Sequence, residues 1–170
     1  ALKDLAELSE RAATVFGPIK THATLLLAPN GSRLVEIEAA PILAKRIVGK
    51  EDVDIGPLIK KLRNSDWVKE GLQYFHDDRC PFCQQDTDHA FREKINEYFD
   101  EQYQADIDAI SGLIQTYATL SEAVLTHIEA LISSDSDHLD IPLISHLHDT
   151  LKSSLGLNAQ HLDRKKKEPS

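Results

Sequence analysis

The sequence is short of cysteine, has no methionine and has no long apolar run. Each shortage argues against a class of protein. Cys80 and Cys83 are the only cysteines in 170 residues, which argues against a disulfide framework and for a reducing cytoplasm. The most apolar patch, at 25–28, is far too short to cross a bilayer, and no signal peptide is visible. Because the chain begins at Ala1 and lacks methionine, we expect a cytoplasmic fragment of a larger protein, with no membrane partner.

Positive charge and catalytic motifs are also scarce. The net charge is -9, and the one basic run, at 164–167, suits the end of a helix. Broad phosphate binding by this segment is therefore not expected. The sequence contains no G-x-x-x-x-G-K-[ST], G-x-S-x-G or H-E-x-x-H. We expect no enzymatic activity in this chain.

The first half of the chain reads as short helices broken by glycine and proline. Helical patterns cover 1–16, 19–28 and the stretch from Pro41 to about Val48. Residues 33–38 fit a short strand or a helix. A further helix is expected to reach about Phe75, with Ser65 or Asp66 as its N-cap. Trp67 is expected to anchor the packing between this small region and the hairpin.

The second half has a much longer helical pattern. Capped by Thr87 or Asp88, it runs to Ser133 with apolar residues at steps of three or four. Its apolar residues fit a heptad repeat in which one position is occupied by a polar residue, Ser121. As one helix it would be about 70 Å long at 1.5 Å per residue. After a polar loop at 133–137, a return helix is expected near Asp140.

A short loop between two such helices makes them antiparallel neighbours. The fold class is therefore mainly α, with a long, coiled-coil-like antiparallel helical hairpin and a small helical or α+β N-terminal region. We divide the chain into a small, mostly helical region at 1–79, a Cys-Pro-Phe-Cys turn at 80–86 and the hairpin at 87–168.

The turn between Cys80 and Cys83 carries the clearest chemistry. Two thiolates at this spacing are half of a tetrahedral zinc site. Either His76 and His89 complete the site within one chain, or Cys80 and Cys83 of a second chain do. Two other interpretations stay open. The cysteines could be small buried hydrophobes, or a thiol redox pair, although no strand series surrounds them.

Several motifs resemble one family, the bacterial P-loop ATPases related to the anticodon nuclease PrrC and its zinc-hook homologue RloC. The similar stretches are Asp66-Trp67-Val68-Lys69-Glu70-Gly71, Cys80-Pro81-Phe82-Cys83-Gln84-Gln85, Tyr98-Phe99-Asp100 and Lys167-Glu168-Pro169-Ser170. The resemblance covers roughly residues 40–170.

The resemblance implies a parent protein with an ATPase head of the structural-maintenance type, split in sequence by a helical arm. This chain would be that arm, and ATP would bind only outside it. In zinc-hook relatives two such turns share one zinc, a role that carries over to Cys80 and Cys83 alone. The implied partners are a second protomer and the ATPase head of the same protein. The implied setting is nucleic-acid processing or phage defence, with nucleic acid contacted only indirectly.

Overall fold

The computed structural model describes residues 4–17, 25–75, 79–80, 83–134, 136 and 138–170, without the side chain of His89. Within them the chain is helical or irregular, apart from one antiparallel bridge between Arg79 and Asp86. The helices are α1 (Leu5–Phe16), α2 (Ser32–Glu38), α3 (Pro41–Ala44), α4 (Gly56–Leu62), α5 (Ser65–Gly71), the 3-10 helix η1 (Leu72–Tyr74), α6 (His89–Tyr98), α7 (Glu101–Ser133) and α8 (Ile141–Lys167).

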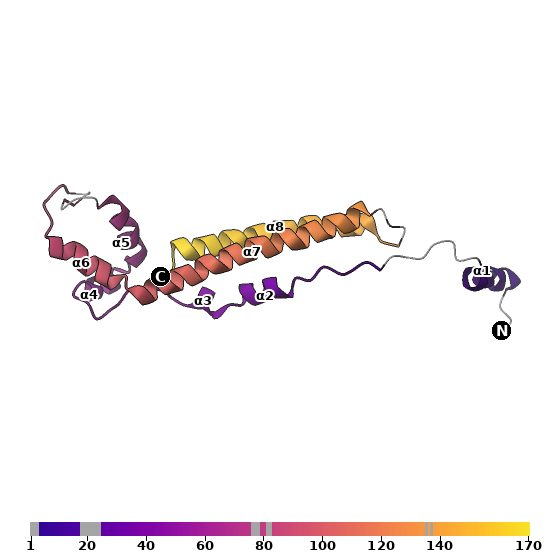
Figure 1. Ribbon diagram of the computed structural model, residues 1–170, viewed down its shortest axis with the longest axis horizontal. Coiled ribbons are helices and arrows are strands. Elements are labelled where there is room, and N and C mark those ends of the chain that lie inside the picture. Colours follow the sequence, from indigo (N-terminus) through magenta and orange to yellow (C-terminus); the bar gives the residue numbers. More distant parts are fainter. Residues whose placement is uncertain (1–3, 18–24, 76–78, 81–82, 135, 137) are drawn as a thin grey trace.

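The predicted antiparallel hairpin is confirmed. Helices α7 and α8 lie side by side along most of their length (Figure 1) and make the most extensive contact between elements. Tyr117 from α7 packs with Leu155 and Leu162 from α8 in one buried cluster. The return helix begins as expected, because the Asp140 carboxylate accepts a hydrogen bond from the Leu143 amide at 3.1 Å.

The expectation of one helix from residue 87 to Ser133 is wrong. The chain breaks between α6 and α7 at Phe99, whose backbone leaves the helical region at φ -91° and ψ 69°. The carbonyl of Tyr98 accepts from the Lys50 amide at 2.7 Å, and the Asp100 carboxylate caps α7 through the Tyr103 amide at 2.9 Å. A contact from a distant segment therefore ends α6, and a local cap starts α7.

The segment before α4 runs along the hairpin instead of forming a layer of its own (Figure 1). Residues 33–38 form helix α2, which buries Leu34 and Ile37 against the hairpin. Part of the helix expected at 19–28 is wrong, because residues 25–28 are irregular; residues 19–24 lie outside the described part of the chain. The carbonyl oxygen of Leu27 lies 3.0 Å from Nε2 of His127, on α7.

Helix α3 ends at Ala44 and does not reach Val48. The backbone after it turns to meet the end of the chain: the Ile47 amide donates to the Pro169 carbonyl at 2.8 Å. The Lys165 ammonium also donates to the Lys45 carbonyl at 2.7 Å. The two ends of the region from 47 to 169 are therefore joined to each other by hydrogen bonds.

Helices α4, α5 and α6 gather beyond the N-terminal end of α7 (Figure 1) and share a small core of Val53, Ile59 and Tyr98. The N-cap of α5 is Asn64 and not Ser65 or Asp66. The Ser65 side chain is buried, with Oγ 3.5 Å from the Tyr98 hydroxyl, so it is turned away from a capping position. Asp88 caps α6 as expected, accepting from the Ala90 amide at 3.2 Å.

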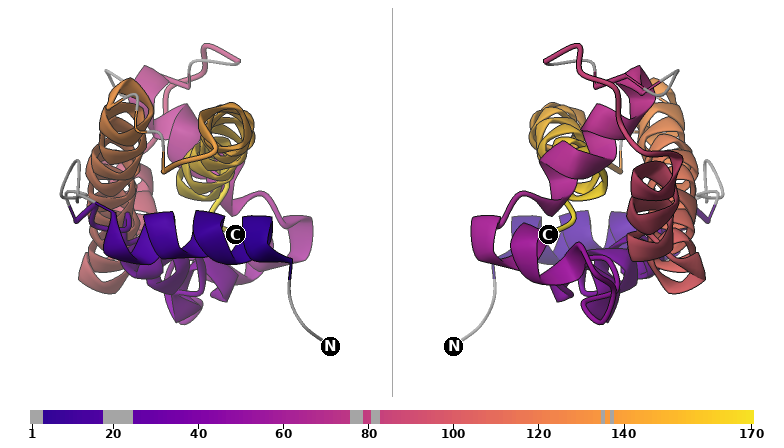
Figure 2. Two further views of the ribbon diagram at one scale, coloured as in Figure 1. Left: turned by 90° about the vertical axis from the view of Figure 1, so that its right-hand side faces the viewer. Right: turned by 90° about the vertical axis from the view of Figure 1, so that its left-hand side faces the viewer.

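Helix α1 is exposed along its whole length. It begins at an Asp4 cap and contains no buried residue. Figure 1 places it away from the hairpin, at the end opposite α4–α6, and both views in Figure 2 show it crossing that end. Its apolar stripe is formed by Leu5, Leu8, Ala12, Val15 and Phe16.

Candidate functional site

The two cysteines lie on a tight turn held by backbone hydrogen bonds. The Cys80 amide donates to the Gln85 carbonyl, and the Gln84 amide donates back to the Cys80 carbonyl, both at 2.9 Å. Gln84 adopts a left-handed conformation at φ 60°, which lets the chain reverse there. Outside the turn, the Arg79 guanidinium lies 3.2 Å from the Asp86 carboxylate. These contacts bring Cys80 close to Gln84 and Gln85, while Pro81 and Phe82 of the predicted turn lie outside the described residues.

The two cysteines are not joined in a disulfide, and they differ in exposure. Cys83 is exposed and its sulfur lies 3.7 Å from the Gln85 amide oxygen, whereas Cys80 is half-buried. Thiolates are soft ligands that suit Zn²⁺, and structural zinc sites take four N or S donors. Two thiols on one hydrogen-bonded turn, one of them open to solvent, fit half of such a donor set.

The remaining donors are not assembled by the described residues. Within them no group of three or more His, Cys, Asp or Glu side chains is placed to hold a metal ion. His76 lies outside the described part of the chain. His89 is the first residue of α6, but its side chain is likewise outside the description. Whether these histidines approach Cys80 and Cys83 therefore stays a prediction.

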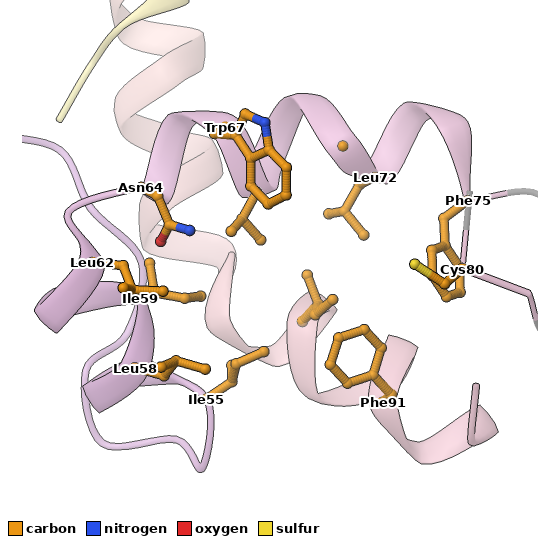
Figure 3. Close-up of a pocket in the computed structure, with 13 residues that line it drawn as sticks. Ile55, Leu58, Ile59, Leu62, Asn64, Trp67, Leu72, Phe75, Cys80 and Phe91 are labelled. Atoms are coloured by element: carbon orange, nitrogen blue, oxygen red, sulfur yellow. The ribbon is translucent and has the colours of Figure 1, made fainter. Parts of the chain in front are cut away.

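Next to the turn lies a groove of about 290 Å³ between α4, α5, η1 and α6, here called the tip groove. Its walls are almost wholly apolar. They are formed by Ile55, Leu58, Ile59, Leu62, Asn64, Trp67, Val68, Gly71, Leu72, Phe75, Cys80, Phe91 and Ile95. Figure 3 shows these side chains converging from three sides, with the Cys80 sulfur directed inward beside Phe75. The cysteine turn therefore closes one end of an apolar surface.

Trp67 does not anchor a core, contrary to expectation. It lies on the wall of the tip groove with 56% of its surface exposed, and Leu58 opposite is 55% exposed. The core that was assigned to Trp67 is instead built by Tyr98 and Phe99, whose rings meet edge to face at 4.9 Å between centroids. Sequence reasoning missed the groove. The signal was the clustering of Leu58, Leu62 and Trp67 on two short helices that are too small to bury them.

A second, polar cavity of about 630 Å³ lies on the other side of Trp67, between α5, the start of α7 and the end of α8. Lys69 stands over the rings of Phe99 and Tyr103 at 4.8 and 5.3 Å from their centroids, and burial lowers the pKa of its ammonium. Burial, aided by the charge of Asp66, raises the pKa of Tyr103 to about 12. The lysines lining this cavity are opposed by as many carboxylates, so it does not favour anions.

This helical chain belongs to the class of ATPase-related proteins. A family model described as an AAA domain, AAA_13, matches residues 1–170. The chain belongs to that family, and so to the proteins related to P-loop ATPases. No curated protein and no solved structure matches the chain. Within the described residues, no helix has both the length and the apolar character that a membrane span requires.

Proposed function

We propose that this chain is a non-enzymatic arm of a larger, SMC-like P-loop ATPase, and that Cys80 and Cys83 bind zinc shared with the same turn of a second protomer. The proposal rests on the position of Cys80 and Cys83, which the backbone hydrogen bonds between Cys80, Gln84 and Gln85 bring onto one turn. Two thiolates leave the coordination of a structural zinc incomplete. An exposed Cys83 is accessible to the thiolates of another chain.

The assignment of this chain as an arm is supported by its family membership and by the shape of the hairpin. The parent would carry the ATPase head, with its nucleotide site outside this chain, and would act in the cytoplasm in nucleic-acid processing or phage defence. Zinc at the shared turn would hold two arms together. Because binding to an assembled site stabilises the dimer by mass action, assembly would depend on metal concentration and pH.

Metal content and mass in solution test this proposal together. The purified chain is measured by elemental analysis and by light scattering, with zinc and with EDTA. We expect one zinc for two chains and a dimer that reverts to monomer in EDTA. The double variant Cys80→Ser, Cys83→Ser removes both effects, whereas His138→Ala, which alters an exposed histidine far from the turn, leaves them unchanged.

Stoichiometry separates the two ways of completing the site. One zinc for each chain, in a monomer, would favour closure by His76 and His89, and His76→Ala with His89→Ala would then release the metal. No bound zinc and an unchanged mass would contradict the metal site altogether. A reversible disulfide between Cys80 and Cys83, detected by alkylation across pH, would indicate redox chemistry instead.

An interaction module without metal is the second candidate, and the position of Cys80 favours it. Its sulfur forms part of the apolar wall of the tip groove (Figure 3), where a thiol acts as a small hydrophobe. In that case the cysteine-to-serine double variant folds and assembles like the wild-type chain.

A further inference from the structure

Asn30 and Gly31 form the one Asn-Gly pair in the sequence, and they lie on the irregular stretch that leads into α2. The side chain of Asn30 is exposed. A Cβ atom built on Gly31 would meet nothing within 4 Å, so the space around this peptide bond is open. In an Asn-Gly pair the backbone nitrogen of the glycine can attack the side-chain amide carbon of the asparagine, because no Cβ atom stands beside the attacking nitrogen.

The hydrogen bonds of this pair suit such an attack. The side-chain oxygen of Asn30 accepts two hydrogen bonds from Ser32, one from its amide at 3.0 Å and one from its hydroxyl at 2.8 Å. Both bonds stabilise the negative charge that develops on this oxygen when a nucleophile adds to the amide carbon. The nucleophile is the Gly31 nitrogen, which donates no hydrogen bond within the described part of the chain. The electrophile is therefore activated and the nucleophile is available.

The other asparagines of the chain lack this arrangement. Asn96 lies within α6 and Asn158 within α8, where the backbone amide of the following residue is used in the hydrogen bonds of the helix. Asn64 is followed by Ser65, and its side-chain oxygen is buried. Sequence and surroundings therefore both distinguish Asn30 from the other three asparagines.

We propose that Asn30 is a site of spontaneous deamidation in the folded chain, with water as the only co-reactant. The Gly31 nitrogen bonds to the side-chain carbon of Asn30. The C–N bond of the side-chain amide breaks, and its nitrogen leaves as ammonia with the proton that the Gly31 nitrogen gives up. Water then adds to either carbonyl carbon of the resulting cyclic imide and opens the ring. One opening gives aspartate, and the other gives isoaspartate, in which the backbone runs through the former side chain.

The two products differ in their effect on α2. Aspartate keeps a side-chain oxygen that accepts from the Ser32 amide, so the start of α2 is preserved. Isoaspartate adds a methylene group to the backbone and removes this contact. Because Leu34 and Ile37 of α2 are buried against the hairpin, the isoaspartate product loosens the attachment of α2 to α7 and α8.

The experiment follows the full 170-residue chain during incubation at 37 °C and pH 6, 7.5 and 9. Trypsin places each asparagine in a peptide of its own, with Asn30 in residues 21–33, and mass spectrometry measures the replacement of NH2 by OH in each peptide. We expect Asn30 to react faster than the other three asparagines. Its rate should rise with pH, since the attacking nitrogen must lose its proton. Labelling by an isoaspartyl methyltransferase measures the second product.

Gly31→Ala is the decisive variant. Its Cβ meets no other atom and φ at this position is -102°, so the fold is kept while the attacking nitrogen becomes hindered; we expect deamidation to slow at least about tenfold. Ser32→Ala removes the hydroxyl donor to Asn30 and should slow the reaction less, because the amide donor remains. Gly112→Ala, at another glycine with open space around it, is the matched control and leaves the rate unchanged.

A synthetic peptide of residues 21–33 separates the chemistry of the sequence from the effect of the fold. If the peptide deamidates while Asn30 of the folded chain stays intact, the fold protects Asn30 and the proposal is overturned. A reaction at Asn30 no faster than at the other asparagines would overturn it as well. The isoaspartate form, separated by ion exchange, should unfold at lower urea concentration than the Asn30→Asp variant. Equal midpoints would refute the loosening of α2.

Discussion

The Tyr117 hydroxyl donates a hydrogen bond of 2.6 Å to the Glu38 carboxylate, 79 residues earlier in the chain. The same carboxylate oxygen accepts from the Asn158 side-chain amide at 2.8 Å. Glu38 is the last residue of α2, Tyr117 lies in the middle of α7 and Asn158 lies on α8. One carboxylate therefore joins the small N-terminal helix to both long helices of the hairpin.

Removing the Tyr117 hydroxyl tests this connection. Tyr117→Phe deletes one donor to a charged acceptor in a part of the core where Tyr117 is only 1% exposed. We expect the free energy of unfolding to fall by about 1–3 kcal/mol, measured by urea denaturation. Tyr74→Phe, at a residue 59% exposed, is the matched control and should change stability little. Equal effects in the two variants would show that the hydrogen bond to Glu38 contributes nothing.

Alkaline pH should weaken the fold through two buried tyrosines. Burial raises the pKa of Tyr103 to about 12, and burial with the hydrogen bond to Glu38 raises the pKa of Tyr117 to about 12. Between about pH 10 and 12 the unfolded chain loses these protons while the folded chain keeps them, so stability present below pH 10 declines as the pH rises.

Unfolding by urea at pH 8, 9, 10 and 11 measures this decline. The Tyr103→Phe and Tyr117→Phe variants should each show a shallower decline than the wild-type chain, whereas Tyr74→Phe should follow the wild type. Identical slopes in all four proteins would mean that the hydroxyls of Tyr103 and Tyr117 ionise normally in the fold.

Gly49 is required because the irregular segment that contains it passes close to Tyr98, at the end of α6. A Cβ atom built there would collide with both the carbonyl oxygen and the ring of Tyr98. Because Lys50 hydrogen-bonds that carbonyl, the backbone cannot withdraw without losing the bond. We expect Gly49→Ala to lower the thermal midpoint, with a cost of about 1–3 kcal/mol.

The control for Gly49 is another glycine. Gly112 lies within α7, and a Cβ there meets nothing within 4 Å. Gly112→Ala should therefore raise stability by up to about 1 kcal/mol through helix propensity alone. A Gly49→Ala variant as stable as the wild type would indicate that the segment at 47–50 moves freely past Tyr98.

Ser121 interrupts the apolar heptads of α7, and its hydroxyl is buried without a hydrogen-bond partner in the described part of the structure. Ser121→Ala removes a desolvated polar group and improves helix propensity. We expect a gain of about 1 kcal/mol or more in the free energy of unfolding. Ser153→Ala, on the exposed surface of α8, gains propensity but loses the hydrogen bond from the Ser153 hydroxyl to the Asp149 carbonyl at 2.9 Å, so it should stabilise less. A larger gain at Ser153 would contradict the cost assigned to the buried hydroxyl.

The hairpin and the cysteine turn could be predicted because their signals are local. Apolar steps of three and four, the Asp140 cap and the polar loop before it specify two helices and a reversal within the segment that forms them. The turn at Cys80 and Cys83 follows from spacing in the same way. Asp88 was found as a cap for the same reason.

The break at Phe99 could not be predicted, because it depends on a partner about fifty residues away. The steps through Tyr98, Phe99 and Tyr103 fit one helix, but the Tyr98 carbonyl is taken by the Lys50 amide. Trp67 shows the same limit. A tryptophan usually indicates a core, yet α4 and α5 are too short to surround it, so it stays on the wall of the tip groove.

The hydrogen bond between Ile47 and Pro169 has a consequence for how the length of the hairpin can vary. Whole turns added to both α7 and α8 beyond the contacts of Glu38 and Leu27 would lengthen the hairpin without shifting the junction of Ile47 with Pro169. The length of the hairpin can therefore change while the hydrogen bond that joins the two ends of this region is kept.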